Sequence, residues 1–450
     1  MKRKIYDELL KWKEEEKGSV AIMIDGARRV GKSYIVEEFA KREYTSYILV
    51  DFAHVEDEVK GYFLNYKTDY DALFMHLSLH FRVKLHERES VIIFDEVEFF
   101  PQAREAVKYL VKDGRYDYIE TGSLVSINAN VEGILIPSEE RRIKMYPMDF
   151  EEFLWAMGEE MMMPYIRDCY EKMQPLEQSL HRRAMDYFRQ YLIVGGMPQA
   201  VERYVRTKSF ERADRIKRDI IDLYRADVRK YAKGYESKVL KIFDTIPGQL
   251  QKHEKKFRLS ALKQRARFRD YESSFFWLEE AMVVNVCYAA TEPSVGLRLK
   301  EDDSTLKCYM GDTGLLISLA FDERTIAGEE LFRKLMLDKL EMNKGMLVEN
   351  VVAQMLKASG HELYFFSSYS KENAEETMEI DFLVRKPTVS SRHNISPIEV
   401  KSGKNYTLSS LTKYRKKYGN QLALSYIIHS GNLRKEGEIV YLPLYMTPYI

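Results

Sequence analysis

The chain has 450 residues, of which 45% are hydrophobic, and its 70 Lys and Arg residues balance its 70 Asp and Glu residues. A length prior of ~150 residues per domain predicts about three packed cores. Zero formal net charge gives no global argument for nucleic acid, a membrane or an acidic substrate, so any basic surface has to be local.

Compartment is predicted from cysteine usage and hydropathy. Cys169, Cys287 and Cys308 are widely spaced and lack paired metal-ligand spacing, which predicts buried thiols in a reducing compartment. No apolar stretch approaches the ~18 residues that span a bilayer, and the first residues run straight into charged ones. We therefore expect a soluble, cytoplasmic protein with no membrane partner.

The first chemical motif is a phosphate-binding loop between the apolar run 20–24 and a helix-like stretch at 34–42. The loop comprises Gly26, Ala27, Arg28, Arg29, Val30, Gly31, Lys32 and Ser33. Its two glycines permit a backbone that turns successive N–H groups toward a phosphate. Lys32 supplies charge for the β and γ phosphates of ATP, and the Ser33 hydroxyl is a Mg²⁺ ligand. A glycine turn before an ordinary helix is the alternative, which the strand–loop–helix placement disfavours.

A second motif, residues 91–96, is a short apolar run that ends in two acids. It is typical of a buried parallel strand that delivers carboxylates to the C-terminal edge of a sheet. We expect Asp95 to hold the Mg²⁺ shell and Glu96 to orient or deprotonate the attacking water. The alternative is a buried strand that ends at a solvated acidic turn.

Short apolar runs alternate with helical patterns up to about residue 150, which predicts a parallel sheet covered by helices. Ligands of such sheets bind at the C-terminal strand edge. The run 118–120 ends in Thr121 and Ser123, one of which we expect to sense the γ phosphate. An ordinary turn hydroxyl is the competing interpretation.

Residues 20–155 resemble prokaryotic AAA-type ATPases. The resemblance rests on the Gly-x-Arg-Arg-x-Gly-Lys-Ser loop, the Asp-Glu strand, the Thr-Gly-Ser strand and the Pro-x-x-Phe-x-Glu-Phe segment at 147–153. It implies that Arg141 or Arg142, on an expected edge strand, could serve as an arginine finger for a neighbouring subunit, and hence that the chain could oligomerise. Glu98 departs from the family, which commonly has Gln there, so the role of that amide does not carry over.

The middle of the chain is predicted to hold a helical lid and a winged helix. Residues 159–235 are helix-patterned around a Gly-Gly turn at 195–196. Residues 236–322 read as three helices and a two-stranded ribbon. Within them, residues 252–269 carry eight Lys or Arg against one Glu, a local charge suited to phosphate contacts with DNA. A basic interdomain loop is the alternative.

The last third carries a second constellation, formed by Glu349, Asp381, Glu399 and Lys401. Glu349 lies on an expected helix and the others on expected strands, where alternation puts Glu399 and Lys401 on one face. Such carboxylates and a lysine could hold Mg²⁺ and position a water for phosphodiester attack. The arrangement resembles the restriction-endonuclease-like fold. Acids and bases at ordinary strand ends are the alternative.

The predicted fold class is therefore α/β: a P-loop NTPase parallel sheet with a helical lid, a winged helix and a C-terminal restriction-endonuclease-like domain. The expected divisions are 1–158, 159–235, 236–322 and 323–450. Three functions compete: an ATPase that binds or processes nucleic acid, an ATP-dependent regulatory switch with a silent nuclease-like domain, and a protein-remodelling ATPase. ATP and Mg²⁺ are the expected cofactors, and DNA is the candidate partner of the basic stretch.

Overall fold

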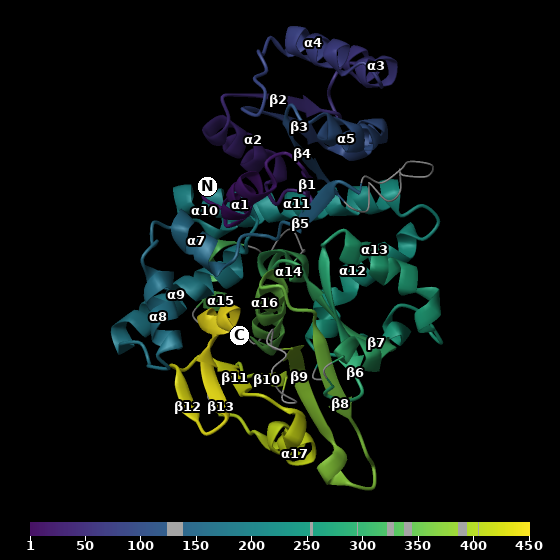
Figure 1. Ribbon diagram of the computed structural model, residues 1–450. Helices are drawn as coiled ribbons and strands as arrows, with labels where there is room; N and C mark the ends of the chain where they lie inside the picture. The colour runs from purple at the N-terminus through teal and green to yellow at the C-terminus, as the bar shows by residue number, and fades with distance from the viewer. Residues whose placement is uncertain are drawn as a thin grey trace. The chain divides into compact units, whose positions relative to one another are not determined.

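A computed structural model describes most of the chain, in eight stretches. The described residues are 1–123, 138–252, 255–294, 296–321, 328–336, 344–385, 394–403 and 405–450. They form two compact units, one of residues 1–147 with 280–282, and one of residues 148–279 with 283–450. Both units are built from helices and strands (Figure 1), so the predicted α/β class is confirmed.

The first unit is built on a five-stranded parallel sheet. Its strands, in spatial order, are β2 (Ser46–Asp51), β3 (Ser90–Asp95), β4 (Asp117–Gly122), β1 (Ala21–Asp25) and β5 (Glu140–Lys144). All neighbouring pairs are parallel, as predicted. Every residue of the inner strands β1, β3 and β4 is buried, which explains their continuous apolar runs. Strand β5 is an edge strand, also as predicted.

Helices pack on this sheet and on one another. They are α1 (Ile5–Glu16), α2 (Lys32–Glu43), α3 (Asp57–Asn65), α4 (Tyr70–Phe81) and α5 (Pro101–Asp113). Helix α2 contacts β2, β3 and β4, whereas α3 and α4 pack against each other beside β2, the strand at the opposite edge from β5 (Figure 1). A core that includes Phe52, Phe63, Phe94 and Phe100 joins α3 to the sheet through ring contacts at 5.4–6.2 Å.

The second unit begins with a run of helices. They are α7 (Phe150–Ala156), α8 (Met162–Glu171), α9 (Gln178–Val194), α10 (Pro198–Thr207) and α11 (Phe210–Tyr231). Helix α7 starts in a capping box, in which Asp149 accepts from the Glu152 N–H and the Glu152 carboxylate accepts from the Asp149 N–H. The Pro-x-x-Phe-x-Glu-Phe pattern is thus the start signal of a helix.

The predicted Gly-Gly turn links α9 to α10 and packs tightly against helix α14 (Thr313–Ala320). Gly195 has a φ of +79° and lies against Asp312, which caps α14 by accepting from the Leu315 N–H and also accepts from the Gly196 N–H. A Cβ on Gly196 would lie 2.1 Å from the Met148 carbonyl oxygen. Neither glycine can be replaced without displacing backbone or the Asp312 cap.

The elements expected for a winged helix are present in the predicted order, but their ribbon belongs to a larger sheet. They are α12 (Glu236–Leu250), the short 3₁₀ helix Leu259–Ala261, α13 (Glu272–Glu280), β6 (Val284–Ala290) and β7 (Glu301–Met310). Strands β6 and β7 pair antiparallel, and β6 also pairs in parallel with β8 (Tyr364–Ser368). The ribbon therefore continues the C-terminal sheet, and the division expected at 322/323 lies outside the described residues.

That sheet has eight strands in the order β12-β13-β11-β10-β9-β8-β6-β7. Its further members are β9 (Met378–Arg385), β10 (Ile395–Val400), β11 (Ser425–His429), β12 (Arg434–Glu436) and β13 (Ile439–Pro443). Helix α16 (Lys344–Ala358) packs on β6, β7 and β10, and α17 (Ser409–Tyr418) packs on β9; α15 (Glu329–Met336) contacts α9 and α11. The sheet is mixed, with parallel pairs at β10–β11 and β11–β13.

Two compositional expectations can be checked against this fold. Cys169, Cys287 and Cys308 are buried and free, as predicted. Across the described stretches, no helix combines the length and the apolar character needed to cross a bilayer.

The tight turn makes a stability prediction. Gly196→Ala should lower the free energy of unfolding by about 1–3 kcal/mol, because its new methyl group must displace the Met148 backbone. Gly248→Ala is the matched control, since nothing lies within 4 Å of a Cβ at this position in helix α12, and it should be neutral or slightly stabilising. Urea unfolding of both variants measures the difference, and equal midpoints would contradict the packing argument.

Candidate functional site

The phosphate-binding loop lies between the C-terminal end of β1 and the start of α2. Gly31 is the N-cap of α2 with a φ of +97°, and Arg29 also has a positive φ, of +71°. Gly26 approaches the segment after β5 so closely that a Cβ would lie 2.4 Å from the Met145 carbonyl oxygen. The predicted need for glycine at 26 and 31 therefore has a steric cause at each position.

Lys32 and Ser33 open helix α2 and turn toward the sheet edge. The buried Lys32 ammonium donates to the carbonyl oxygens of Gly26 and Ala27, at 2.9 and 3.3 Å. The Ser33 hydroxyl donates to Asp95 Oδ1 at 2.9 Å. Asp95 follows Ser33 by more than sixty residues in the sequence. The fold nevertheless brings the acidic strand end into contact with the phosphate-binding loop.

Thr121 completes this edge from strand β4. Its hydroxyl donates to the same Asp95 oxygen and accepts from the Glu96 backbone N–H at 3.3 Å. Burial raises the pKa of Asp95, although the Thr121 and Ser33 hydrogen bonds favour its charged form. Of the two predicted sensor residues, Thr121 contacts the acidic pair through its side chain, whereas Ser123 contacts Glu98 through its backbone N–H.

Glu98, the departure from the family pattern, is buried close to this edge. The Ser123 N–H donates to Glu98 Oε1 at 3.3 Å. Burial, reinforced by the neighbouring charge of Glu96, raises the pKa of Glu98 to about 8. A carboxyl group that keeps its proton at neutral pH offers both a donor and an acceptor, as the Gln amide common in the family does, but with one donor fewer.

The two candidate finger arginines lie on the edge strand β5, and both are exposed and paired within the unit. Arg141 forms an ion pair with Glu16, and Arg142 Nε lies 2.8 Å from Glu140 Oε1. Glu140 also accepts a bidentate pair from the buried Arg104, at 2.9 and 3.1 Å. The finger assignment stays a prediction.

The residues at this edge fit a magnesium nucleotide. Ser33 and Asp95 present hard oxygen ligands 2.9 Å apart, the donor type that Mg²⁺ prefers. The α2 N-terminus and the loop N–H groups suit an anionic phosphate chain, and Lys32 adds the mobile charge. A bound Mg²⁺ would neutralise charge on the β and γ phosphates.

The second constellation, in the C-terminal sheet, assembles around a residue that the sequence analysis did not single out. Lys307 on β7 is fully buried, and its Nζ lies 3.4 Å from Glu349, 2.8 Å from Glu379 and 3.8 Å from Asp381. Burial opposes its charge, yet these three acids raise the pKa of Lys307 well above its ordinary value. A protonated ammonium therefore occupies the space between Glu349 and Asp381.

Glu349 is further committed to Lys255 and Tyr309, with which it forms an ion pair and a hydrogen bond. Burial would raise the pKa of Glu349, but Lys307 and Lys255 outweigh it and hold the pKa below its usual range. Asp381 accepts from the Val400 N–H at 2.8 Å, and burial together with Glu349 raises its pKa to about 6. Both acids are thus satisfied without a metal ion.

Glu399 and Lys401 lie together, as alternation predicted. Lys401 Nζ is 2.5 Å from Glu399 Oε2, although the approach lacks hydrogen-bond geometry. In the described residues, the acids of this constellation do not converge as a metal-ligand set; the one group of three that does is elsewhere, in the first unit. Lys307, Lys255 and Glu379 were missed because a single sequence cannot show which residues of distant strands face one another.

The basic stretch lies between α12 and α13, and six of its eight cations fall into two sets. Lys252 donates to Gln249, and Lys255 is held by Glu349, so these two bind within the fold. Another four are exposed and form no ion pair with an acid in the described part of the chain: Lys263, Arg265, Arg267 and Arg269. This second set is the exposed basic cluster.

The first unit has the parallel sheet, phosphate loop and acidic strand end that define a P-loop nucleoside triphosphatase. Residues 19–154 match the family model described as an AAA domain, so this region is an AAA-type P-loop domain. Residues 185–325 and 344–446 match models described as domains of unknown function, DUF8612 and DUF4143. No curated protein matches the chain.

Solved structures show only distant similarity. The Orc1 protein of Aeropyrum pernix, in complex with DNA, is 13% identical with a TM-score of 0.30 over 72% of this chain and 93% of its own. Cdc6p of Pyrobaculum aerophilum is 14% identical with a TM-score of 0.26 over 75% and 94%. A signal-transduction ATPase with numerous domains and a tetratricopeptide repeat sensor, from Pyrococcus horikoshii, is 10% identical with a TM-score of 0.27 over 79% and 48%. Scores this low carry no argument about function.

Glu98 predicts a specific pH dependence of stability. Its folded-state pKa is raised, so between about pH 5 and 8 the folded protein keeps a proton that the unfolded chain has released, and stability falls as pH rises. The slope should approach about 1.4 kcal/mol per pH unit. Glu98→Gln should remove this slope, and the exposed Glu87→Gln should not. Urea unfolding at pH 5.5, 7 and 8.5 tests it; parallel pH profiles for wild type and Glu98→Gln would contradict it.

Proposed function

We propose that the protein is a Mg²⁺-dependent ATPase that couples ATP hydrolysis to nucleic-acid binding, and that its C-terminal domain does not cleave the bound strand. The observation that supports ATP hydrolysis best is the convergence of Lys32, Ser33, Asp95 and Thr121 at one sheet edge. Lys32 would bind the phosphates, while Ser33 and Asp95 would hold Mg²⁺.

Glu96 is the best candidate to orient and activate the attacking water. It directly follows Asp95 and has a positive φ of +52°, a conformation in which few non-glycine residues are found. Its backbone N–H is held by Thr121 Oγ1. Strain of this kind clusters at functional positions, which favours a role for this side chain.

Nucleic-acid binding is supported by the exposed basic cluster at 263–269. Four cations on a short segment, none of which pairs with an acid among the described residues, would gain counterion-release energy from a phosphate backbone. Binding without cleavage is favoured over processing because Lys307 stands between Glu349 and Asp381, where a nuclease would need a metal ion. A protein that binds nucleic acid without cleaving it could act as a regulatory switch, whose affinity for nucleic acid changes when ATP is bound or hydrolysed. A protein-remodelling ATPase is the remaining alternative.

Substitutions at the ATP site should separate binding from hydrolysis. Lys32→Ala should abolish ATP binding, whereas Glu96→Gln should keep it and lower the hydrolysis rate by about 10²–10⁴-fold, the range for loss of a general base. Lys41→Ala is the matched control, because this lysine lies on the same helix and pairs with Glu37 on the surface. Fluorescent-nucleotide titration and phosphate release provide the two readouts. Wild-type turnover in Glu96→Gln would contradict the assignment.

Removing charge from the basic cluster should weaken DNA binding. In Arg265→Gln/Arg267→Gln, the dependence of log affinity on log salt should fall by about one for each lost phosphate contact. Arg182→Gln/Arg203→Gln removes the same charge from exposed positions on α9 and α10 and should bind like wild type. Filter binding of labelled duplex and single-stranded DNA, with and without ATP and Mg²⁺, measures both.

The same samples test cleavage. We expect intact DNA with the wild type and with Asp381→Asn alike, so Mg²⁺-dependent cleavage that Asp381→Asn abolishes would establish a nuclease instead. Absence of DNA affinity even at low salt would favour the remodelling alternative, because the four exposed cations of the basic cluster should produce measurable binding under those conditions.

A further inference from the structure

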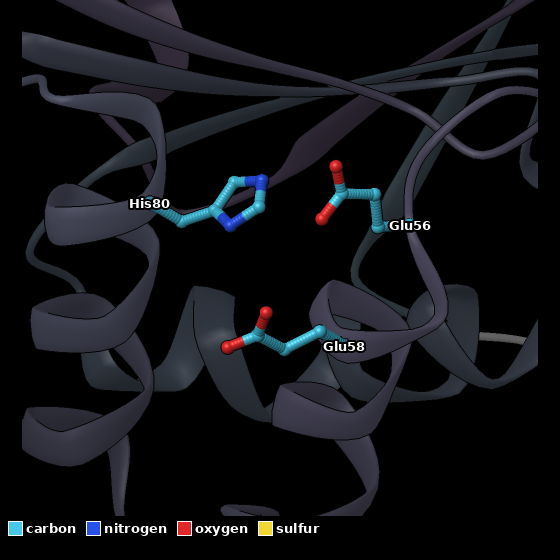
Figure 2. Close-up of side chains that lie close together, drawn as sticks. All are labelled: Glu56, Glu58 and His80. Atoms are coloured by element: carbon cyan, nitrogen blue, oxygen red, sulfur yellow. The ribbon is translucent and has the colours of Figure 1, made fainter.

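Two glutamates and a histidine converge on the surface of the first unit, between helices α3 and α4. Glu56 is the N-cap residue of α3, Glu58 lies in its first turn, and His80 lies in the last turn of α4. Each offers one ligand atom, and the three atoms lie within 4.8 Å of one another. Figure 2 shows the two carboxylates and the imidazole ring directed into a common space.

The charges around this group are unbalanced. Glu56 and Glu58 are exposed, His80 is half-buried, and within the described residues no lysine or arginine pairs with either glutamate. The nearest acid in sequence, Asp57, differs because it pairs with Lys60. Two carboxylates so close together repel each other unless a cation lies between them.

The surrounding contacts position the ligands without consuming them. The Tyr62 hydroxyl donates to Glu58 Oε1 at 2.7 Å, which leaves Oε2 available, and the Tyr62 ring packs edge-on to His80 with centroids 6.3 Å apart. Glu56 makes no side-chain cap to α3. A hydrogen bond that orients a ligating carboxylate is the usual outer-shell arrangement of protein metal sites.

We propose that Glu56, Glu58 and His80 bind a divalent transition-metal ion of the Zn²⁺ class. One imidazole nitrogen with two carboxylate oxygens suits Zn²⁺, whereas Mg²⁺ and Ca²⁺ prefer oxygen ligands alone. Ligand atoms around a tetrahedral Zn²⁺ are about 3.4 Å apart, so closure from the present separation needs only small side-chain rotations. Three protein ligands leave a position for water or for a group from another molecule.

The site would join the start of α3 to the end of α4. These two helices pack on each other, and α4 contacts the sheet at β2. A metal ion here would thus hold the two helices together. Its site shares no ligand with the Mg²⁺ site expected at Ser33 and Asp95. The inference does not depend on the ATPase or DNA-binding proposals.

The test is Zn²⁺ titration of the full-length protein by calorimetry without nucleotide. We expect one Zn²⁺ per chain. The affinity for Zn²⁺ should fall at least about tenfold in both His80→Ala and Glu58→Gln, because changing even an outer-shell partner of a metal ligand costs about that much. His54→Ala is the matched control, because this neighbouring exposed histidine pairs with Asp51 and lies outside the group. Excess Mg²⁺ should not compete.

Two outcomes would overturn the proposal. One is Zn²⁺ binding that neither His80→Ala nor Glu58→Gln weakens, which would place the ion elsewhere. The other is no Zn²⁺ binding by the wild type up to about 100 μM Zn²⁺. Circular dichroism and ATP binding report whether each variant is folded, and Glu58→Gln, an exposed isosteric change, keeps the test valid if His80→Ala does not fold. Visible absorption of bound Co²⁺ in place of Zn²⁺ would report on the ligand set directly.

Discussion

A buried carboxylate, that of Asp312, organises the helical half of the second unit. It caps α14, accepts from the Gly196 N–H, and lies near Lys217, whose ammonium donates to the carbonyl oxygens of Ile193 and Gly314 at 2.7 and 3.2 Å. Burial raises the pKa of Asp312 and lowers that of Lys217, while Asp214 and Asp312 favour the charged form of Lys217, and Lys217 favours that of Asp312. Helices α9, α11 and α14 are thus joined by one buried cluster of charged groups.

The same constraint explains why glycine occupies three positions around this point. A Cβ at Gly195 would meet Asp312, one at Gly196 would meet the Met148 carbonyl, and one at Gly314 would lie 2.5 Å from the Val194 carbonyl. The backbones of α9, α14 and the segment before α7 can approach this closely only where side chains are missing. The two glycines predict a turn at 195–196, but no local pattern indicates its partner, Asp312, which is over a hundred residues away.

Local signals predicted the first unit well, since its strands are buried apolar runs and its phosphate loop has a fixed spacing. The parallel pairing and the edge position of β5 followed from the same patterns. The eight-stranded sheet was not predicted, because nothing local indicates that β6 would pair with β8, some seventy residues later. Likewise Glu349, Asp381 and the Glu399–Lys401 pair were recognised, whereas Lys307 was overlooked as one more residue of a strand.

Lys307 changes what the C-terminal constellation means chemically. An ammonium ion carries one charge and donates hydrogen bonds, but it cannot coordinate a water or a phosphoryl oxygen as a Lewis-acidic metal ion does. In our proposal, the acids that it contacts are therefore stabilised as a group and do not serve hydrolysis. The contact of Lys255 with Glu349 also ties the basic stretch to this group.

The shared sheet has a consequence for how such a chain can be divided. Strand β6 lies between β8 and β7, so the ribbon after α13 and the C-terminal strands form one hydrogen-bonded surface. A fragment that stops near residue 322 would leave β6 with an open edge, which invites pairing with other molecules. The same open edge would arise if recombination replaced the C-terminal region alone. An exchange that keeps the sheet intact would therefore have to include the ribbon of β6 and β7.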